Sequence, residues 1–206
     1  MLAAKPVYHR AMPADSSDVT AFILAGGKST RMGRDKAFVV LEGRTLLERM
    51  LDLAQSATAE VRIVGDPGKF SNFATVVEDV FPGCGPLAGI HAALRSSPTD
   101  LNLILPVDIP FLSPEFLKFL IERSRAAAAT VTVVGISGSW QPLSAIYRRT
   151  FADLAEEALR VGRYKIDALF AQTQIEVISE SDLRTAGYSP QIFRNLNTPD
   201  DLSGCG

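Results

Sequence analysis

The 206-residue chain has little cysteine and histidine: two residues of each. Cys84 and Cys205 lie far apart in the sequence and form no CxxC pair. This spacing argues against both a zinc cluster and a disulfide framework. We therefore expect a reduced, cytoplasmic protein.

The chain also lacks an excess of charge of either sign and any long hydrophobic run. Its 21 Lys and Arg residues against 23 Asp and Glu residues give a formal net charge of −2, which excludes a generally basic nucleic-acid coat. The apolar runs fall short of the roughly 18–20 residues that a membrane-spanning helix needs, and no signal-peptide core is evident. We expect neither nucleic acid nor membrane as a partner.

What the chain does have is enough apolar sequence, 47% of residues, to bury a sizeable core. Residues 1–18 mix Ala, Pro, Ser and charge without a helical or strand period, and we interpret them as a flexible N-terminal arm. Residues 19–202 are predicted to form a single domain, followed by a tail at 203–206.

Short runs rich in β-branched residues alternate with segments of helical spacing. This alternation predicts an α/β domain with a mainly parallel sheet covered on both faces. Thr45 and Ser113 are predicted N-caps, Thr45 with Glu48 three residues on and Ser113 with a proline following. The predicted strands are Val19–Leu24, Val61–Val64, Ala74–Val77, Leu101–Leu105, Thr130–Val134, Gln141–Tyr147 and Ile175–Ile178; the predicted helices are 46–54, 87–94, 116–121, 151–159 and 166–170.

Residues 24–36, directly after the first strand, hold three glycines and four cationic side chains. Glycines let main-chain N–H groups approach an anion, and Lys and Arg neutralise its charge, so this loop is typical of phosphate binding. A solvated surface turn is the alternative. It is not a P-loop, because Phe22 stands where the first glycine of that motif is required, and the dinucleotide-binding spacing is not met either.

Acidic residues follow two further strands. Asp108, flanked by Pro106 and Pro110, is placed to hold a divalent metal at the sheet edge; a turn or helix-capping role is the alternative. Asp79 leaves its strand in the same way, with Glu78 as a competitor. The glycines of the turn at 83–89 suit either a ligand-approaching helix start or a tight turn with positive φ.

Taken together, the motifs resemble the molybdenum cofactor guanylyltransferase family, from about residue 19 to residue 202. The fold that this implies is a three-layer α/β/α, Rossmann-like nucleotidyltransferase domain. The matching motifs are Leu24-Ala25-Gly26-Gly27 with Ser29, Arg31-Met32-Gly33, Asp35-Lys36, Gly85-Pro86-Leu87-Ala88-Gly89, Pro106-Val107-Asp108-Ile109-Pro110-Phe111, Gln141-Pro142-Leu143 and Asn195-Leu196-Asn197-Thr198-Pro199.

The resemblance implies transfer of GMP from GTP to molybdopterin, or to its molybdenum-loaded form, with release of pyrophosphate. The implied nucleotide-binding residues are Leu24, Ala25, Gly26, Gly27, Lys36, Gly65, Asp79 and Asp108. Asp108 would also carry Mg²⁺, and Asn195 and Asn197 would face the pterin. The chain departs from the family pattern at one position that concerns recognition of the guanine base. After the second strand the family often has an Asn that contacts the guanine, whereas this chain has Gly65-Asp66.

The expected chemistry needs charge stabilisation rather than a Ser–His pair, because a terminal phosphate is already nucleophilic at neutral pH. Lys36, Arg31 and Mg²⁺ on Asp108 are the expected catalytic groups. By the same resemblance we expect GTP and molybdopterin as substrates, molybdoenzyme-maturation proteins as recipients of the product, and a monomer.

Two alternatives stay open. The first is a nucleotidyltransferase of the same scaffold that uses CTP, or that acts on a sugar phosphate; cytidylyl relatives usually show Ala-Ala-Gly at the position of Gly26-Gly27. The second is a non-catalytic nucleotide-binding adaptor for cofactor delivery. The presence of Lys36, Asp79 and Asp108 argues against an adaptor, since binding alone has less need of a metal site.

Overall fold

The computed structural model describes residues 17–26 and 35–196. Its elements run in the order β1 (Val19–Leu24), η1 (Lys36–Phe38), β2 (Val40–Leu41), β3 (Arg44–Thr45), α1 (Leu46–Gln55), β4 (Glu60–Val64), α2 (Pro67–Phe70), β5 (Thr75–Val77), α3 (Pro86–Ser96), β6 (Leu101–Pro106), α4 (Pro114–Ala126), β7 (Val131–Ile136), β8 (Ser139–Trp140), β9 (Ala145–Arg148), α5 (Phe151–Arg160), α6 (Asp167–Phe170), β10 (Ile175–Ile178), α7 (Glu180–Thr185) and η2 (Pro190–Phe193).

One sheet organises the domain, with strand order β10-β7-β9-β6-β1-β4-β5 and β8 paired to β7. The four strands β6, β1, β4 and β5 pair in parallel, and so do β10 and β7. β9 runs antiparallel to both β6 and β7. The prediction of a mainly parallel sheet in an α/β domain is therefore confirmed.

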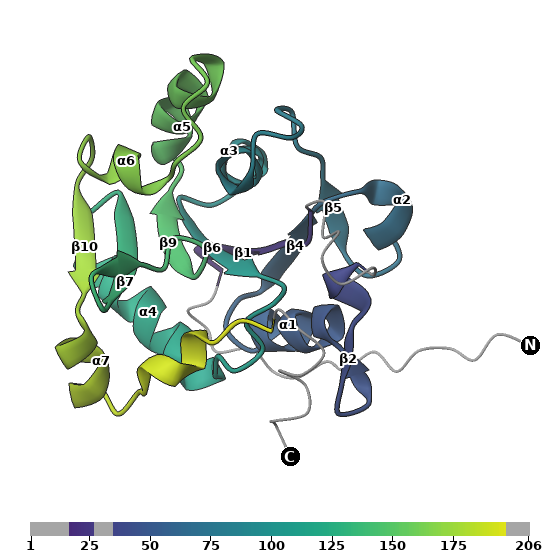
Figure 1. Cartoon of the computed structure of the whole chain (residues 1–206), viewed down its shortest axis with the longest axis horizontal. Helices are drawn as coiled ribbons and strands as arrows, with labels where there is room; N and C mark the ends of the chain where they lie inside the picture. The colour runs from purple at the N-terminus through teal and green to yellow at the C-terminus, as the bar shows by residue number, and fades with distance from the viewer. Residues whose placement is uncertain (1–16, 27–34, 197–206) are drawn as a thin grey trace, which may run out of the picture.

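Helices cover both faces of this sheet: α3, α5 and α6 lie above it in Figure 1, and α1 and α4 lie below it. Neighbouring residues of a strand point to opposite faces. Thus Phe22 packs into the core beneath α3 and α5, whereas Ile23 packs into the core over α1 and α4. Both side chains are fully buried, which explains why the strands read as continuous apolar runs.

The predicted caps are confirmed. The Thr45 hydroxyl accepts from the Glu48 N–H, while the Glu48 carboxylate accepts from the Thr45 N–H, so that α1 begins with a capping box. The Ser113 hydroxyl accepts from the Phe116 N–H, and Pro114 opens α4. Both helices thus begin where local chemistry predicts.

The predicted strand Gln141–Tyr147 is wrong in its first half. Residues 141–144 form a turn closed by the Ser144 N–H on the Gln141 carbonyl, at 3.0 Å, and β9 begins only at Ala145. Pro142 has no N–H to donate to a ladder, so it favours the turn. Its carbonyl instead accepts from the Tyr147 hydroxyl at 2.7 Å.

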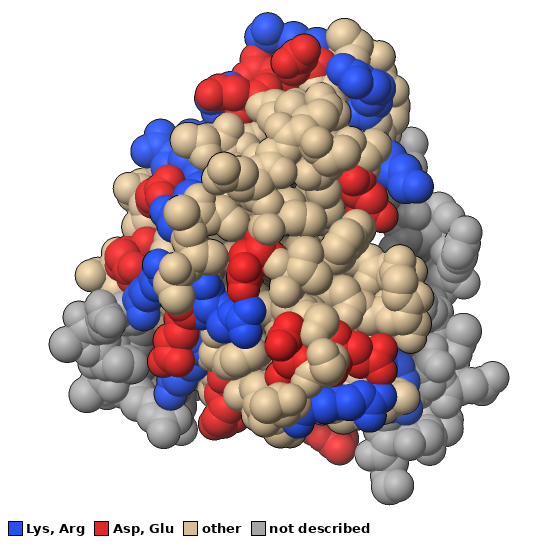
Figure 2. Space-filling view, turned by 90° about the vertical axis from the view of Figure 1, so that its left-hand side faces the viewer, with Lys and Arg blue, Asp and Glu red and all other residues tan. Residues whose placement is uncertain are grey.

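The surface carries mixed charge on the face formed by the β10 edge. Figure 2 shows positive and negative side chains beside one another around a largely uncharged centre, without a continuous basic band among the described residues on that face. Within the described part of the chain, no helix is long and apolar enough to cross a membrane.

Candidate functional site

Four parallel strands end side by side at one edge of the sheet. Leu24 at the end of β1 is the register partner of Pro106 in β6 and of Val64 in β4, and Val64 is in turn the partner of Val77 in β5. At the usual strand spacing this row spans about 14 Å. The residues that directly follow these strands therefore lie together at one end of the sheet, the usual place for ligands in such a fold.

Lys36 and Asp108 meet at this edge. The Lys36 Nζ lies 2.7 Å from the Asp108 Oδ2, and each side chain is 21% exposed. Lys36 opens the short helix η1, which Asp35 caps by accepting from the Ala37 N–H. Asp108 follows β6 by two residues. Two of the three residues predicted for charge stabilisation are thus brought together, and the third, Arg31, lies outside the described residues.

The start of the glycine-rich loop is held by the neighbouring strand. The N–H groups of Ala25 and Gly26 both donate to the Val64 carbonyl, at 3.0 and 3.2 Å. These two donors are already used, so other main-chain atoms of Ala25 and Gly26 must make any contact with a nucleotide.

Gly65 and Asp66 both have structural roles here. A Cβ on Gly65 would lie 2.9 Å from ring atoms of Phe70, a distance that real Cβ atoms essentially never show. Phe70 is buried and thus unable to withdraw easily. The Asp66 carboxylate accepts from the Gly68 N–H at 2.8 Å and caps α2. The space of an Asn side chain at position 65 is therefore taken by an aromatic ring.

Asp79, rather than Glu78, is turned into the structure. Asp79 is half-buried, and its Oδ1 accepts from the Phe81 N–H at 2.8 Å, while Glu78 is exposed. The Asp79 carboxylate therefore orders the turn that leaves β5. This turn-capping role leaves its second oxygen without a hydrogen bond to any described residue.

The turn before α3 needs its glycines for backbone reasons. Gly83 and Gly85 have φ of 82° and 77°, in the left-handed region that favours glycine. Gly85 is also the N-cap of α3 and makes no side-chain cap. The tight-turn interpretation thus accounts for both residues.

The end of the described chain docks beside Asp108. The Leu196 N–H donates to the Asp108 carbonyl at 3.0 Å, and the Arg194 guanidinium lies over the Phe111 ring at 4.6 Å. Asn195, between these two anchors, is exposed. The predicted pterin-side residue is therefore held next to the predicted metal ligand, although the two are remote in sequence.

Three predicted site residues, Gly27, Arg31 and Asn197, lie outside the described residues, as do most of the predicted arm and the tail. Among the residues that are described, no group of three or more His, Cys, Asp or Glu side chains could hold a metal.

Sequence reasoning missed two contacts made by the segment that carries Lys36, residues 35–38. Lys69 of α2 pairs with Asp35 at 2.8 Å, and Phe38 stacks on Phe70 with ring centroids 5.8 Å apart. No local pattern links these partners, because more than thirty residues separate each pair. The only sequence signal for these contacts was the Asp66-Pro67 dipeptide, which is typical of a helix start and so indicates the helix that carries Lys69 and Phe70.

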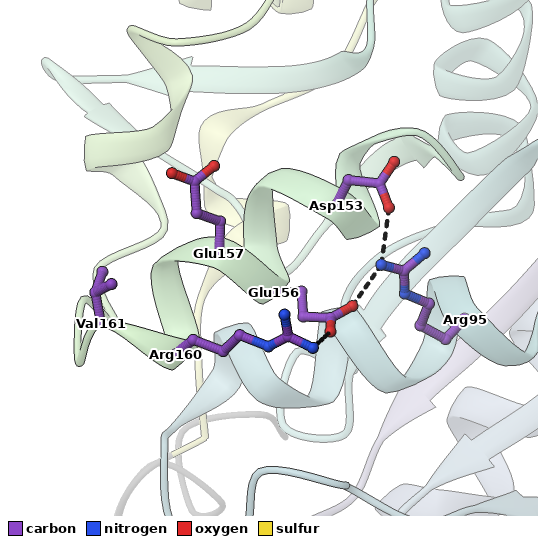
Figure 3. A pocket seen from close by; sticks show the side chains of 6 residues that line it. All are labelled: Arg95, Asp153, Glu156, Glu157, Arg160 and Val161. Carbon is purple, nitrogen blue, oxygen red and sulfur yellow. Dashed lines mark hydrogen bonds and ion pairs between the residues drawn. The ribbon is translucent and has the colours of Figure 1, made fainter.

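A separate pocket of about 460 Å³ lies between α3 and α5. Figure 3 shows Glu156 between Arg95 and Arg160, and Arg95 also pairs with Asp153. Arg95 holds the pKa of Glu156 below its usual value. None of the strand-end residues lines this pocket, whose charged lining consists of three carboxylates and two guanidinium groups.

Comparisons with known proteins identify the family of this chain. Residues 21–177 match the family model described as a MobA-like NTP transferase domain. The molybdenum cofactor guanylyltransferase of Desulfosudis oleivorans is 34% identical, covering 89% of this chain and 92% of its own length. A relative from Pelotomaculum thermopropionicum, named "Probable molybdenum cofactor guanylyltransferase", is also 34% identical, over 89% of both chains.

A solved structure has the same fold. The molybdopterin-guanine dinucleotide biosynthesis protein A of Archaeoglobus fulgidus superimposes with a TM-score of 0.79 at 29% identity, covering 90% of this chain and 95% of its own. The chain is therefore a nucleotidyltransferase that belongs to the molybdenum cofactor guanylyltransferases, within the MobA-like NTP transferase family.

Proposed function

We propose that this protein transfers GMP from GTP to molybdopterin, or to its molybdenum-loaded form, and releases pyrophosphate. The observation that carries the proposal is the meeting of Lys36 with Asp108, 2.7 Å apart, at the shared edge of β6, β1 and β4. A cation and a carboxylate at this edge suit a reaction between two anions, and relatives with this fold are named for this transfer.

In the proposed step, a terminal phosphate oxygen of molybdopterin attacks the α-phosphorus of GTP. The new P–O bond forms as the bond between the α-phosphorus and the bridging oxygen breaks, and pyrophosphate leaves with that electron pair. The attacking phosphate is ionised at neutral pH, so no protein base is required. Lys36 neutralises the charge that grows on the phosphates, and Arg31 is proposed to assist it.

Asp108 is the proposed Mg²⁺ ligand. Lys36 donates to its Oδ2, and a carboxylate whose coordination is completed by phosphate oxygens fits the ligand preference of Mg²⁺. When bound, Mg²⁺ would polarise the α-phosphate and hold the leaving pyrophosphate. Lys36 and Mg²⁺ would then together neutralise the negative charge of the triphosphate.

The proposed nucleotide contacts run along the strand ends: the main chain of Leu24, Ala25 and Gly26, with Gly27, then Gly65 and Asp79. Gly65 brings no side chain to the base, so recognition of guanine at this position would use the main chain. Asn195 is proposed to contact the pterin substrate, supported by its place beside Asp108, and Asn197 is proposed with it. We further propose a cytoplasmic monomer that passes its product to molybdoenzyme-maturation proteins.

The test is to incubate the purified protein with Mg²⁺, molybdopterin and each of the four nucleoside triphosphates in turn, and to follow pyrophosphate. We expect release only with GTP, and only when molybdopterin is present. Release with CTP, or with a sugar phosphate in place of molybdopterin, contradicts the proposal. Tight GTP binding without any release would instead support an adaptor.

A further inference from the structure

The short helix α2 contacts the segment that carries Lys36. The Lys69 Nζ lies 2.8 Å from the Asp35 Oδ2. The other oxygen of the same carboxylate, Oδ1, accepts from the Ala37 N–H at 3.2 Å and so caps η1. Lys69 thus fixes the carboxylate that shapes the turn beginning at Lys36.

An aromatic contact joins the same two elements on a second flank. The Phe38 ring stacks on the Phe70 ring at 5.8 Å, with 24° between their planes, and lies 6.1 Å from the Phe73 ring. Phe38 is 40% exposed, whereas Phe70 is buried. Phe70 is itself seated against Gly65, where a Cβ would collide with it. α2 therefore presents a fixed surface to η1.

The connection that contains α2 also holds the other end of the glycine-rich loop. Val64, just before the connection, accepts from the N–H groups of Ala25 and Gly26. One stretch of chain, residues 64–70, therefore contacts both residues 25–26 and residues 35–38, the two described segments that flank positions 27–34. We call this stretch the β4–α2 bracket.

We infer that the β4–α2 bracket positions Lys36 for the phosphates of the nucleotide, with Lys69 as a positioning residue that acts through Asp35. The inference rests on the proposed function, since it assigns Lys36 to those phosphates. A lysine has a long, flexible side chain, and its ammonium is effective only if its backbone is already in place. The bracket supplies that placement through a charged contact and a stacked contact.

Because the Lys69–Asp35 ion pair is exposed, a positioning role for it can be distinguished from a contribution to the stability of the fold. The Lys69 side chain is 51% exposed and that of Asp35 is 25% exposed, and an ion pair this open adds little to global stability. Its loss is therefore expected to leave the melting temperature almost unchanged. Small displacements of a catalytic group reduce rates far more than stability.

The experiment compares Lys69→Met with the conservative Lys69→Arg. Amide hydrogen exchange tests the effect of the β4–α2 bracket without any substrate. The amides of Ala37, Phe38 and Val39 donate hydrogen bonds within the turn. Lys69→Met should speed the exchange of these amides several-fold, about the effect of losing one exposed ion pair. Lys69→Arg should not. Arg125→Met is the control. Arg125 pairs with Asp18, which precedes β1 and so lies at the amino end of the strand, away from Lys36.

Steady-state kinetics then test whether Lys69 acts through Lys36. Lys69→Met should lower kcat/KM for GTP by about tenfold, with Lys69→Arg and Arg125→Met within about twofold of the parent. In a Lys36→Ala background the same Lys69→Met change should have almost no further effect, because residues that act through one another are not additive.

Unchanged exchange in Lys69→Met overturns the inference, and so do losses that simply add to that of Lys36→Ala. If the parent releases no pyrophosphate from GTP and molybdopterin, the proposed function fails, and exchange of the three amides still decides whether the bracket holds the Lys36 turn.

Discussion

The Lys36 ammonium lies 2.7 Å from the Asp108 carboxylate although 72 positions separate the two residues. Each charge therefore neutralises the other where the triphosphate of GTP and the terminal phosphate of molybdopterin are proposed to meet. The pair is only partly buried, so nucleotide phosphates and a cation can reach both partners.

Replacing either partner should stop turnover while leaving the fold intact. We expect Lys36→Met and Asp108→Asn each to lower the rate of pyrophosphate release by about 10²–10³, the usual effect of removing one group that stabilises transition-state charge. Steady-state assays measure this, with circular dichroism as the check on folding. Near-parental turnover in both variants would refute the assignment.

Removing divalent metal should abolish turnover reversibly. Chelation with EDTA is expected to stop pyrophosphate release, and added Mg²⁺ to restore it, because the proposed Mg²⁺ on Asp108 would polarise the α-phosphate and hold the leaving pyrophosphate. Mn²⁺ titration followed by electron spin resonance, with GTP present, should show affinity at least about tenfold weaker in Asp108→Asn. Asp153→Asn, on α5, is the matched control and should bind Mn²⁺ like the parent.

Asn195→Ala should separate the two substrates. Asn195 is exposed beside Asp108, and we expect KM for molybdopterin to rise about tenfold, the effect of a lost hydrogen bond of about 1.4 kcal/mol. KM for GTP should stay within about twofold. Asn72→Ala, an exposed asparagine after α2, serves as the control; an equal rise in both KM values would argue against a pterin-side role.

Gly65→Ala should destabilise the fold through Phe70. The new Cβ would lie 2.9 Å from the ring, and such overpacking costs about 1–3 kcal/mol of unfolding free energy. Urea denaturation measures it. Gly89→Ala is the control, since a Cβ there meets Leu24 and Val64 at ordinary contact distances of 3.4–3.9 Å. Partial recovery in Gly65→Ala/Phe70→Leu would identify the ring as the cause.

Tyr147 should make stability fall at alkaline pH. Burial holds the pKa of its phenol well above the usual value, while in the unfolded chain the phenol ionises near pH 10. Below about pH 10 both states keep the proton; as pH rises further the unfolded state binds fewer protons, and stability declines. Urea midpoints at about pH 9 and pH 11 should therefore differ more in the parent than in Tyr147→Phe. An equal difference would contradict this assignment.

Much of the fold could be predicted from local sequence. The strands β1, β4, β6 and β7 were recognisable as apolar runs, and the caps at Thr45 and Ser113 as short side-chain patterns. The error at Gln141–Tyr147 has the same local origin: an apolar pattern was read through Pro142, whose missing N–H ends the ladder.

The sequence by itself determined which residues could do the chemistry: a loop of glycines and cations after one strand, and carboxylates after two others. Only the tertiary structure decided which of them meet. The Lys36–Asp108 pair, the Lys69–Asp35 contact and the docking of Leu196 on Asp108 all join residues remote in the chain. These contacts depend on strand order and on backbone hydrogen bonds between strands, and local propensity encodes neither.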